Sequence, residues 1–382
     1  MKKLLSLSAL LLLSSCIGII VNQTSDSKSN AGTISESNSF SSKDSSNKKN
    51  IQTPKVIIVA GWENGKDIGD APGEYQFWVE RLHLDQKVPI HGVKTQVLRR
   101  NKEGVYGIVL KDGIFDLSAL ALDPKFDLKK TYWIFTGISG IDPKEASVGS
   151  VAWARWVVDG DALREIDDRK IPKSWPYGLW AIGADTPNTL PKDPNHYGSV
   201  TDVAQLSKAY PLNPSLTDWA YQISQSAKLS SLKLTDAEKA QWKNYPEATK
   251  APKIMLGETL GALRYWHGEE RTQWARDWVK LWTNQKGRFV MTNEESQTNQ
   301  IEMRRLAKQD LIDPQRVMVL RSGSNFCLPP QGISAEISMG NEGDGQVIAF
   351  DNNERAGEPV VKELVKHWDK YKDTLPSLTP KK

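Results

Sequence analysis

Small and polar residues follow four predicted buried strands, and their types suit chemistry on a bound ligand. TGISG at 136–140 comes directly after an apolar run, and similar stretches are GWENGKDIGDAPGE at 61–74, GETLGALRYWHG at 257–268 and RSGSNFCLPP at 321–330. A glycine-rich turn after a strand lets backbone N–H groups approach a ligand, although a turn needed only for packing has the same composition. These strand ends are therefore where we look for a site.

The sequence lacks the motifs of several common site types. None of the four stretches is a GxGxxG or Walker loop, so neither dinucleotide nor ATP binding is predicted, and without GxSxG a hydrolase triad is disfavoured. The five His residues show no metal-ligand spacing, so no metal and no cofactor are expected. His267 is interpreted as structural, and Cys327 as a buried small hydrophobe rather than a reactive thiol.

The elements that must position the four stretches alternate between strand and helix. Continuous apolar runs predict buried strands at 55–62, 131–137, 150–158, 253–258 and 316–323. Amphipathic patterns predict helices at 269–282, 294–309 and 358–371, the last with Pro359 in its first turn. This alternation predicts an α/β sheet with helices on both faces, in which ligands bind at the carboxyl ends of the strands.

Charge and hydropathy exclude two classes of partner. The 382 residues carry a net charge of only +4, with acidic and basic residues interspersed, so no nucleic acid is expected. Beyond the N-terminus every apolar run is broken by charge or Gly within about ten residues, too short to span a membrane.

The N-terminus predicts export. Lys2 and Lys3 precede a short apolar stretch that ends in LSSC at Cys16, as in a bacterial lipoprotein signal whose Cys carries lipid; the alternative is an ordinary signal peptide with an incidental Cys. Residues 17–53, rich in Ser, Asn and Lys, are expected to form a disordered tether. We thus expect an exported bacterial lipoprotein, anchored to the membrane by its lipid and facing the periplasm, with a folded body at 54–375 and a tail at 376–382.

Four long segments of the body resemble one known family. GDAPGEYQFWVERL, VDGDALREIDDRKIPKSW, YWHG and RVMVLRSGSNFCLPP occur in that order and are similar to segments of the purine nucleoside permease family, itself similar to nucleoside phosphorylases and nucleosidases. The resemblance covers about 54–371. It implies a three-layer α/β/α sandwich with a mixed central sheet, and a purine nucleoside as ligand. It assigns no chemistry to the stretch DGDALREIDDR.

The resemblance also implies roles for individual residues. Thr136, Gly137 and Gly140 would face the ribose and the base. Glu294 would hold the ribose hydroxyls, since a carboxylate can accept two vicinal hydroxyls at once, but an acid at a helix start is also favoured by the helix dipole.

At the base, Asn325 would face N7 and the 6-substituent of the purine, with Ser324 orienting it. A donor to N7 gains strength as the glycosidic bond breaks, which is the transition-state interaction that catalysis needs. Tyr265 and Trp266 are candidates for stacking on the base, with core packing as the alternative.

The first strand end departs from the phosphorylase pattern. Phosphorylases carry Gly and Arg there to hold phosphate, whereas this chain has no Arg between Lys55 and Arg81 and places Glu63 near the turn. Glu63 is thus a candidate catalytic acid that activates water, as in the related nucleosidases. Hydrolysis is favoured over phosphorolysis, although Arg99 and Arg100 could bring inorganic phosphate as a co-substrate.

Three functions remain open from the sequence. The protein binds purine nucleosides and cleaves the N-glycosidic bond, in uptake or purine salvage; or it is a non-catalytic nucleoside-binding component of a transport system; or it is a lipid-tethered scaffold without chemistry. Assembly as a homo-oligomer is compatible with each.

Overall fold

The computed structural model describes residues 51–94, 96–191, 208–340, 343 and 345–378, all within the compact unit that spans Lys48–Lys382. The expected signal segment, with Cys16, lies outside these residues, as does nearly all of the expected tether. The described strands are β1 (Val56–Ala60), β2 (Gln86–Pro89), β3 (Val97–Arg100), β4 (Val105–Val109), β5 (Tyr132–Ile141), β6 (Val151–Trp153), β7 (Trp156–Asp159), β8 (Leu163–Glu165), β9 (Leu179–Ala181), β10 (Ala209–Pro211), β11 (Ile254–Leu256), β12 (Glu258–Gly261), β13 (Phe289–Asn293) and β14 (Val317–Phe326).

Twelve of these strands form one mixed sheet. Its main path runs β10-β7-β12-β13-β5-β1-β4-β3-β2, while β14, β6 and β11 branch from it at β5. The central strands β4, β1, β5 and β14 are parallel, so their carboxyl ends meet at one edge. β13 joins β5 antiparallel at Gly140 and Ile141, which brings the end of β13 to that same edge. β8 and β9 form a separate antiparallel pair.

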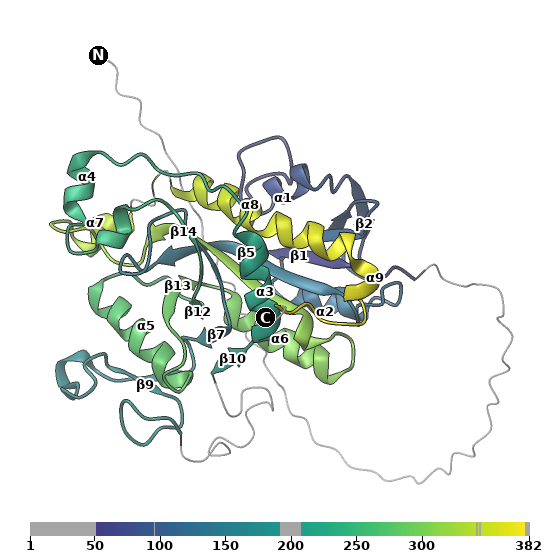
Figure 1. Cartoon of the computed structure of the whole chain (residues 1–382). Coiled ribbons are helices and arrows are strands. Elements are labelled where there is room, and N and C mark those ends of the chain that lie inside the picture. The colour runs from purple at the N-terminus through teal and green to yellow at the C-terminus, as the bar shows by residue number, and fades with distance from the viewer. Residues whose placement is uncertain (1–50, 95, 192–207, 341–342, 344, 379–382) are drawn as a thin grey trace, which may run out of the picture. The chain divides into compact units, whose positions relative to one another are not determined.

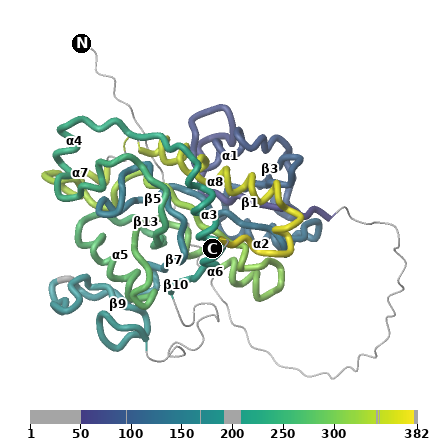
Figure 2. The backbone as a smooth tube through the Cα atoms, viewed as in Figure 1, coloured from purple at the N-terminus to yellow at the C-terminus, as the bar shows by residue number. Residues whose placement is uncertain are grey.

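Helices cover both faces of the central strands, as Figure 1 shows and the backbone trace in Figure 2 follows. The described helices are α1 (Gln76–Arg81), α2 (Ile114–Leu122), α3 (Pro214–Ser224), α4 (Asp236–Gln241), α5 (Glu269–Trp282), α6 (Ser296–Lys308), α7 (Ala335–Met339), α8 (Gly345–Lys366) and α9 (Trp368–Tyr371). Residues of α1, α3 and α8 share one buried cluster with the sheet, and residues of α2 and α6 share another. The predicted α/β class with a mixed central sheet between helices is confirmed.

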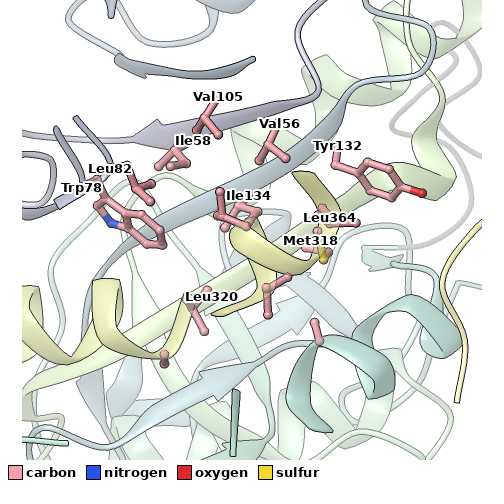
Figure 3. Close-up of a cluster of buried hydrophobic side chains, with 14 of the residues drawn as sticks. Val56, Ile58, Trp78, Leu82, Val105, Tyr132, Ile134, Met318, Leu320 and Leu364 are labelled. Carbon is pink, nitrogen blue, oxygen red and sulfur yellow. The ribbon is translucent and has the colours of Figure 1, made fainter. Parts of the chain in front are cut away.

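Alternation along the strands builds the two faces. Ile58 of β1, Ile134 of β5 and Leu320 of β14 belong to one buried cluster with Trp78 of α1 and residues of α8, part of which Figure 3 shows. Their neighbours Val59, Phe135 and Val319 belong to the cluster on the α2 and α6 side. Side chains along a strand alternate between its two faces with a period of two. The same alternation therefore tells on which face of the sheet each later residue of these strands lies.

The expected turn at 136–140 is wrong, because this stretch is the second half of β5. The strand continues to Ile141, paired with β14 on one side and with β13 on the other. The small residues instead make room for neighbours: a Cβ on Gly137 would overlap the side chains of Arg321 and Glu74, and one on Gly140 would lie 3.1 Å from Cγ2 of Thr292. The stretch is rigid sheet rather than a loop.

Two apolar runs that predict single strands are each divided in two. The run at 150–158 forms β6 and β7, and the run at 253–258 forms β11 and the start of β12. The pieces pair in the same way, β11 with β6 and β12 with β7, so both runs bend together. Gly257 lies at the second bend, where a Cβ would overlap Val290. Close contact between neighbouring segments, as at Gly257, accompanies the division of these runs, and an apolar sequence pattern does not reveal it.

The last helix also begins earlier than predicted. α8 starts at Gly345, so Pro359 lies inside it rather than in its first turn. Pro removes one backbone donor from a helix interior. Buried residues on both sides of Pro359, among them Ala356, Val360 and Leu364, keep the helix packed on the sheet.

Candidate functional site

The loop that follows β1 folds back and places Glu74 over the carboxyl ends of β1 and β5. Oε2 of Glu74 accepts hydrogen bonds of 3.0 Å from the N–H groups of Gly61 and Trp62, and Oε1 accepts one of 2.7 Å from that of Ile138. Its exposed fraction is 9%. One carboxylate thus joins the first loop to the central strand.

Arg321 of β14 reaches the same place from the other side of β5. Val317 and Val319 face the α6 layer, so Arg321, two residues further along, faces it too. Its guanidinium, only 1% exposed, forms an ion pair with Glu295 and donates a 2.7 Å hydrogen bond to Oγ of Ser296 at the start of α6. Gly137, its neighbour on β5, leaves the space in which Arg321 and Glu74 approach each other.

The electrostatics of this cluster favour proton transfer near neutral pH. Burial, and next the charge of Glu295, raise the pKa of Glu74 to about 7, against the opposing effects of Arg321 and the backbone N–H groups. A carboxyl group that titrates near 7 is suited to act as a general base or acid.

Buried polar atoms without partners surround the cluster. Among the described residues, Nε of Arg321 and Oγ of Ser139 have no hydrogen-bond partner. Ser139 lies on β5 two residues after Gly137, on the same face, and is 4% exposed. Since buried polar atoms are nearly always paired in native proteins, these atoms are available to a polar ligand.

A second group of polar side chains lies further along β14. Ser324 is the extra residue of a bulge between Gly323 and Asn325, and bulges of this kind re-aim side chains beside active sites. The Ser324 hydroxyl donates a 2.8 Å hydrogen bond to Oδ1 of Asn325, the orienting contact that the resemblance implies. Nδ2 of Asn325 lies 3.3 Å from the hydroxyl of Tyr265.

A cavity of about 350 Å³ opens beside Ser324 and Asn325. Trp242 and Phe326 line this cavity, with their ring centroids 4.2 Å apart, and Ile337 of α7 also lines it. An aromatic wall next to a paired amide suits a flat heterocycle with polar edges.

Glu63, the predicted catalytic acid, holds the first loop together. Oε1 accepts from the N–H groups of Asn64 and Gly73, and Oε2 accepts from those of Tyr75 and Gln76 at 2.7 Å each. Burial raises the pKa of Glu63, while these four backbone hydrogen bonds lower it. Four backbone donors occupy the carboxylate of Glu63 and three occupy that of Glu74, so Glu74 keeps one acceptor position more; the catalytic role expected of Glu63 stays a prediction.

The acid beside α6 is Glu295 rather than Glu294. Glu294 is exposed, whereas Glu295 is half-buried, pairs with Arg321 and lies against Gly61, where a Cβ would be 3.3 Å from its carboxyl carbon. Glu295 is therefore a second candidate for the ribose-binding role expected of Glu294, which stays a prediction.

The remaining predicted residues divide between the site and the core. Gly137 lies in the cluster, and Gly140 pairs with Asn325 across β5 and β14. Thr136 is buried on the other face, where its hydroxyl donates to Oδ1 of Asn353. Trp266 packs against Trp274 and Phe289, so it is core and not a wall of the site. Tyr265 is 42% exposed beside Asn325, and its stacking role stays a prediction.

Sequence reasoning did not single out Glu74, Glu295 or Arg321, whereas Ser139 lies in the predicted stretch at 136–140. An available signal was Arg321, a cation directly after the apolar run 317–320, which needs a partner if it is buried. The described residues contain no group of three or more His, Cys, Asp or Glu side chains placed to hold a metal ion. Among those same residues, no helix has the length and apolar character needed to cross a membrane.

Solved structures align with this chain at low sequence identity. Futalosine hydrolase of Helicobacter pylori aligns with a TM-score of 0.48 and 12% identity, over 82% of this chain and 99% of that chain. A 5′-methylthioadenosine/S-adenosylhomocysteine nucleosidase from Neisseria meningitidis aligns with a TM-score of 0.45 and 13% identity, over 82% and 100%.

Two similar proteins are fungal. A purine nucleoside permease of Candida albicans is 30% identical over 258 residues, 66% of this chain and 61% of that protein, so the chain spans less than two thirds of that relative. A probable purine nucleoside permease of Schizosaccharomyces pombe is 31% identical over 263 residues, 66% of this chain and 72% of that protein. These fungal relatives contradict the expected bacterial lipoprotein, and the localisation that depends on lipid at Cys16 is withdrawn.

The family model agrees with the relatives and with the resemblance seen in the sequence. The model described as purine nucleoside permease matches residues 53–376, nearly the whole of the folded body. The chain belongs to the purine nucleoside permease family.

Proposed function

We propose that the protein binds a purine nucleoside at the carboxyl ends of β5 and β14 and hydrolyses its N-glycosidic bond. The observation that carries the proposal is the buried cluster of Glu74, Glu295 and Arg321, in which burial and a neighbouring acid raise the pKa of Glu74 to about 7. A cluster of this kind is costly to bury and is typical of sites that move protons.

The two polar groups along β14 give the ligand its orientation. At about 3.3 Å per residue, Arg321 and Asn325 lie at most about 13 Å apart along the strand, and the bulge at Ser324 shortens this. The ribose would lie at the cluster, where Glu295 takes the role implied for Glu294 and accepts from the sugar hydroxyls. The purine would lie against Asn325, toward the cavity walled by Trp242 and Phe326.

The chemistry then follows from the position of each group. Ionised Glu74 accepts a proton from water as the water oxygen bonds to C1′ and the bond from C1′ to N9 breaks. The electron pair of that bond stays on the purine, which takes up a proton from solvent. Nδ2 of Asn325 donates a hydrogen bond to N7 as negative charge develops on the ring.

Water is favoured over phosphate by the charge of the site. In this arrangement two carboxyl groups, Glu74 and Glu295, and one guanidinium, Arg321, flank the nucleophile, and the excess of carboxyl groups disfavours a phosphate dianion. Arg99, one of the cations considered for phosphate, is buried and bound to Asp67 with a 2.6 Å ion pair. Inorganic phosphate as a co-substrate is therefore the alternative that the experiment must address.

The test measures free purine released from inosine and from adenosine by the purified chain, with and without phosphate. Release without phosphate that is lost in Glu74→Gln supports the proposal. Release that requires phosphate would replace hydrolysis by phosphorolysis. Nucleoside-dependent thermal stabilisation without release of purine would favour a non-catalytic binding component for uptake. If neither stabilisation nor release occurred, a scaffold without chemistry would be favoured.

A further inference from the structure

The acidic stretch after β7, to which the sequence assigned no chemistry, binds two other segments. Oδ2 of Asp161 accepts a 2.7 Å hydrogen bond from the N–H of Leu263 and a 3.0 Å hydrogen bond from Nε2 of Gln297. Oδ1 accepts a 2.6 Å hydrogen bond from Nη1 of Arg264. One carboxylate therefore holds the loop after β12 and the first turn of α6.

The two segments carry opposite halves of the candidate site. The loop after β12 contains Tyr265, whose hydroxyl lies 3.3 Å from Nδ2 of Asn325 at the base end. The first turn of α6 contains Ser296, which contacts Arg321, and directly follows Glu295 at the sugar end.

Hydrogen bonds and close packing fix the position of Asp161 and of the segments that it contacts. Oδ1 of Asp159 accepts hydrogen bonds from the N–H groups of Asp161 at 2.8 Å and of Ala162 at 3.1 Å, which fixes the turn after β7. At Gly261 a Cβ would lie 2.8 Å from the backbone nitrogen of Gln297, so the end of β12 and the start of α6 are already in close contact. Arg264 also lies over the ring of Trp274, 5.7 Å from its centroid, which links the loop to the core.

We propose that Asp161 is a positioning residue that sets the base end and the sugar end of the nucleoside site relative to each other. The proposal rests on the proposed function for the identity of the ligand, but not for the positioning itself. A carboxylate suits the task because it offers only acceptors to three donors, one of them a cation. An amide in its place would turn an NH₂ group toward one of those donors.

Hydrogen exchange on the full chain tests the positioning without any ligand. The variant is Asp161→Asn, and the matched control is Asp167→Asn, which removes an exposed acid of the same stretch that pairs with Arg169. Loss of about one charged hydrogen bond should raise exchange by about tenfold at residues 262–268 and 295–300 in Asp161→Asn only. Unchanged exchange there, or an equal rise throughout the chain, would overturn the proposal.

Nucleoside affinity provides a readout that general destabilisation would not give. Inosine affinity is measured in wild type, Asp161→Asn, Tyr265→Phe and the double variant. If Asp161 acts through the loop that carries Tyr265, its substitution weakens binding about tenfold alone but only about threefold beside Tyr265→Phe. Additive losses would contradict the proposal. If wild type binds no inosine, the proposed function fails, and the exchange measurement alone decides the role of Asp161.

Discussion

Glu74 and Glu258 are both buried and both titrate near neutral pH, yet only one lies in a candidate site. Burial raises the pKa of each to about 7, and each accepts backbone hydrogen bonds that oppose this rise. Glu258 lies at the start of β12, at the end of that strand away from Tyr265. It accepts from the N–H groups of Arg155 at 3.0 Å and Trp156 at 2.6 Å.

The neighbours of the two acids differ. Beside Glu74 stand a second carboxyl group, a buried guanidinium and the unpaired hydroxyl of Ser139. Glu258 is instead packed closely against the backbone, since a Cβ on Gly287 would lie 3.1 Å from Cγ of Glu258. A raised pKa therefore does not mark a site by itself, and these two acids differ in the charged groups beside them.

The largest expected effect comes from exchanging each acid for its neutral amide. Glu74→Gln should lower kcat for purine release by about 10³-fold, because the general base is lost, while the dissociation constant of inosine stays near that of wild type. Glu258→Gln should release purine at the wild-type rate. Single-turnover assays and calorimetry measure both quantities, and equal losses in the two variants would erase the comparison.

The pH profile of the reaction should report the same acid. Only ionised Glu74 accepts a proton, so kcat/KM should rise about tenfold per pH unit below 7 and level off above it. A profile that is flat from pH 5 to pH 8 would remove Glu74 from the reaction.

The adjacent acids at the start of α6 offer a smaller, matched contrast. Glu295→Gln should weaken inosine binding about tenfold, because it removes a charged acceptor beside Arg321. Glu294→Gln, at the exposed neighbouring position, should bind inosine like wild type. If Glu294→Gln gave the larger loss, the sugar end of the site would have to be reassigned.

The smallest effect concerns stability. An acid whose pKa is raised on folding stabilises the native state below its unfolded pKa, and this contribution is lost as pH rises through the folded pKa. The pKa values of Glu74, Glu258 and Glu354 are each raised to about 7. The melting temperature should therefore fall as the pH rises from 4.5 to 8. Glu258→Gln should reduce that decrease by a few degrees, about 2–4 °C per kcal/mol. An unchanged slope in calorimetric scans would mean that Glu258 keeps its ordinary pKa.

Much of the fold follows from local patterns, whereas the site depends on contacts between distant segments. The apolar runs of β1 and β14 and the stripe of α5 identify those elements, because burial on a regular repeat is written in the sequence itself. Glu74 escaped notice because a folded-back loop brings it to Gly61, thirteen positions away. The sequence also does not distinguish Glu295 from Glu294, because neighbouring positions at a helix start point in different directions.

Because residues 137–141 belong to β5 and pair with β14 over their whole length, and with β13 at Gly140 and Ile141, the sheet holds the proposed floor of the site in place when a ligand arrives. We therefore expect two wall segments to set the rates at which a ligand enters and leaves the site. These are the loop between β1 and α1 and the segment that carries Tyr265. Relatives that accept ligands of other sizes would be expected to differ in the length of those walls and to keep the floor unaltered.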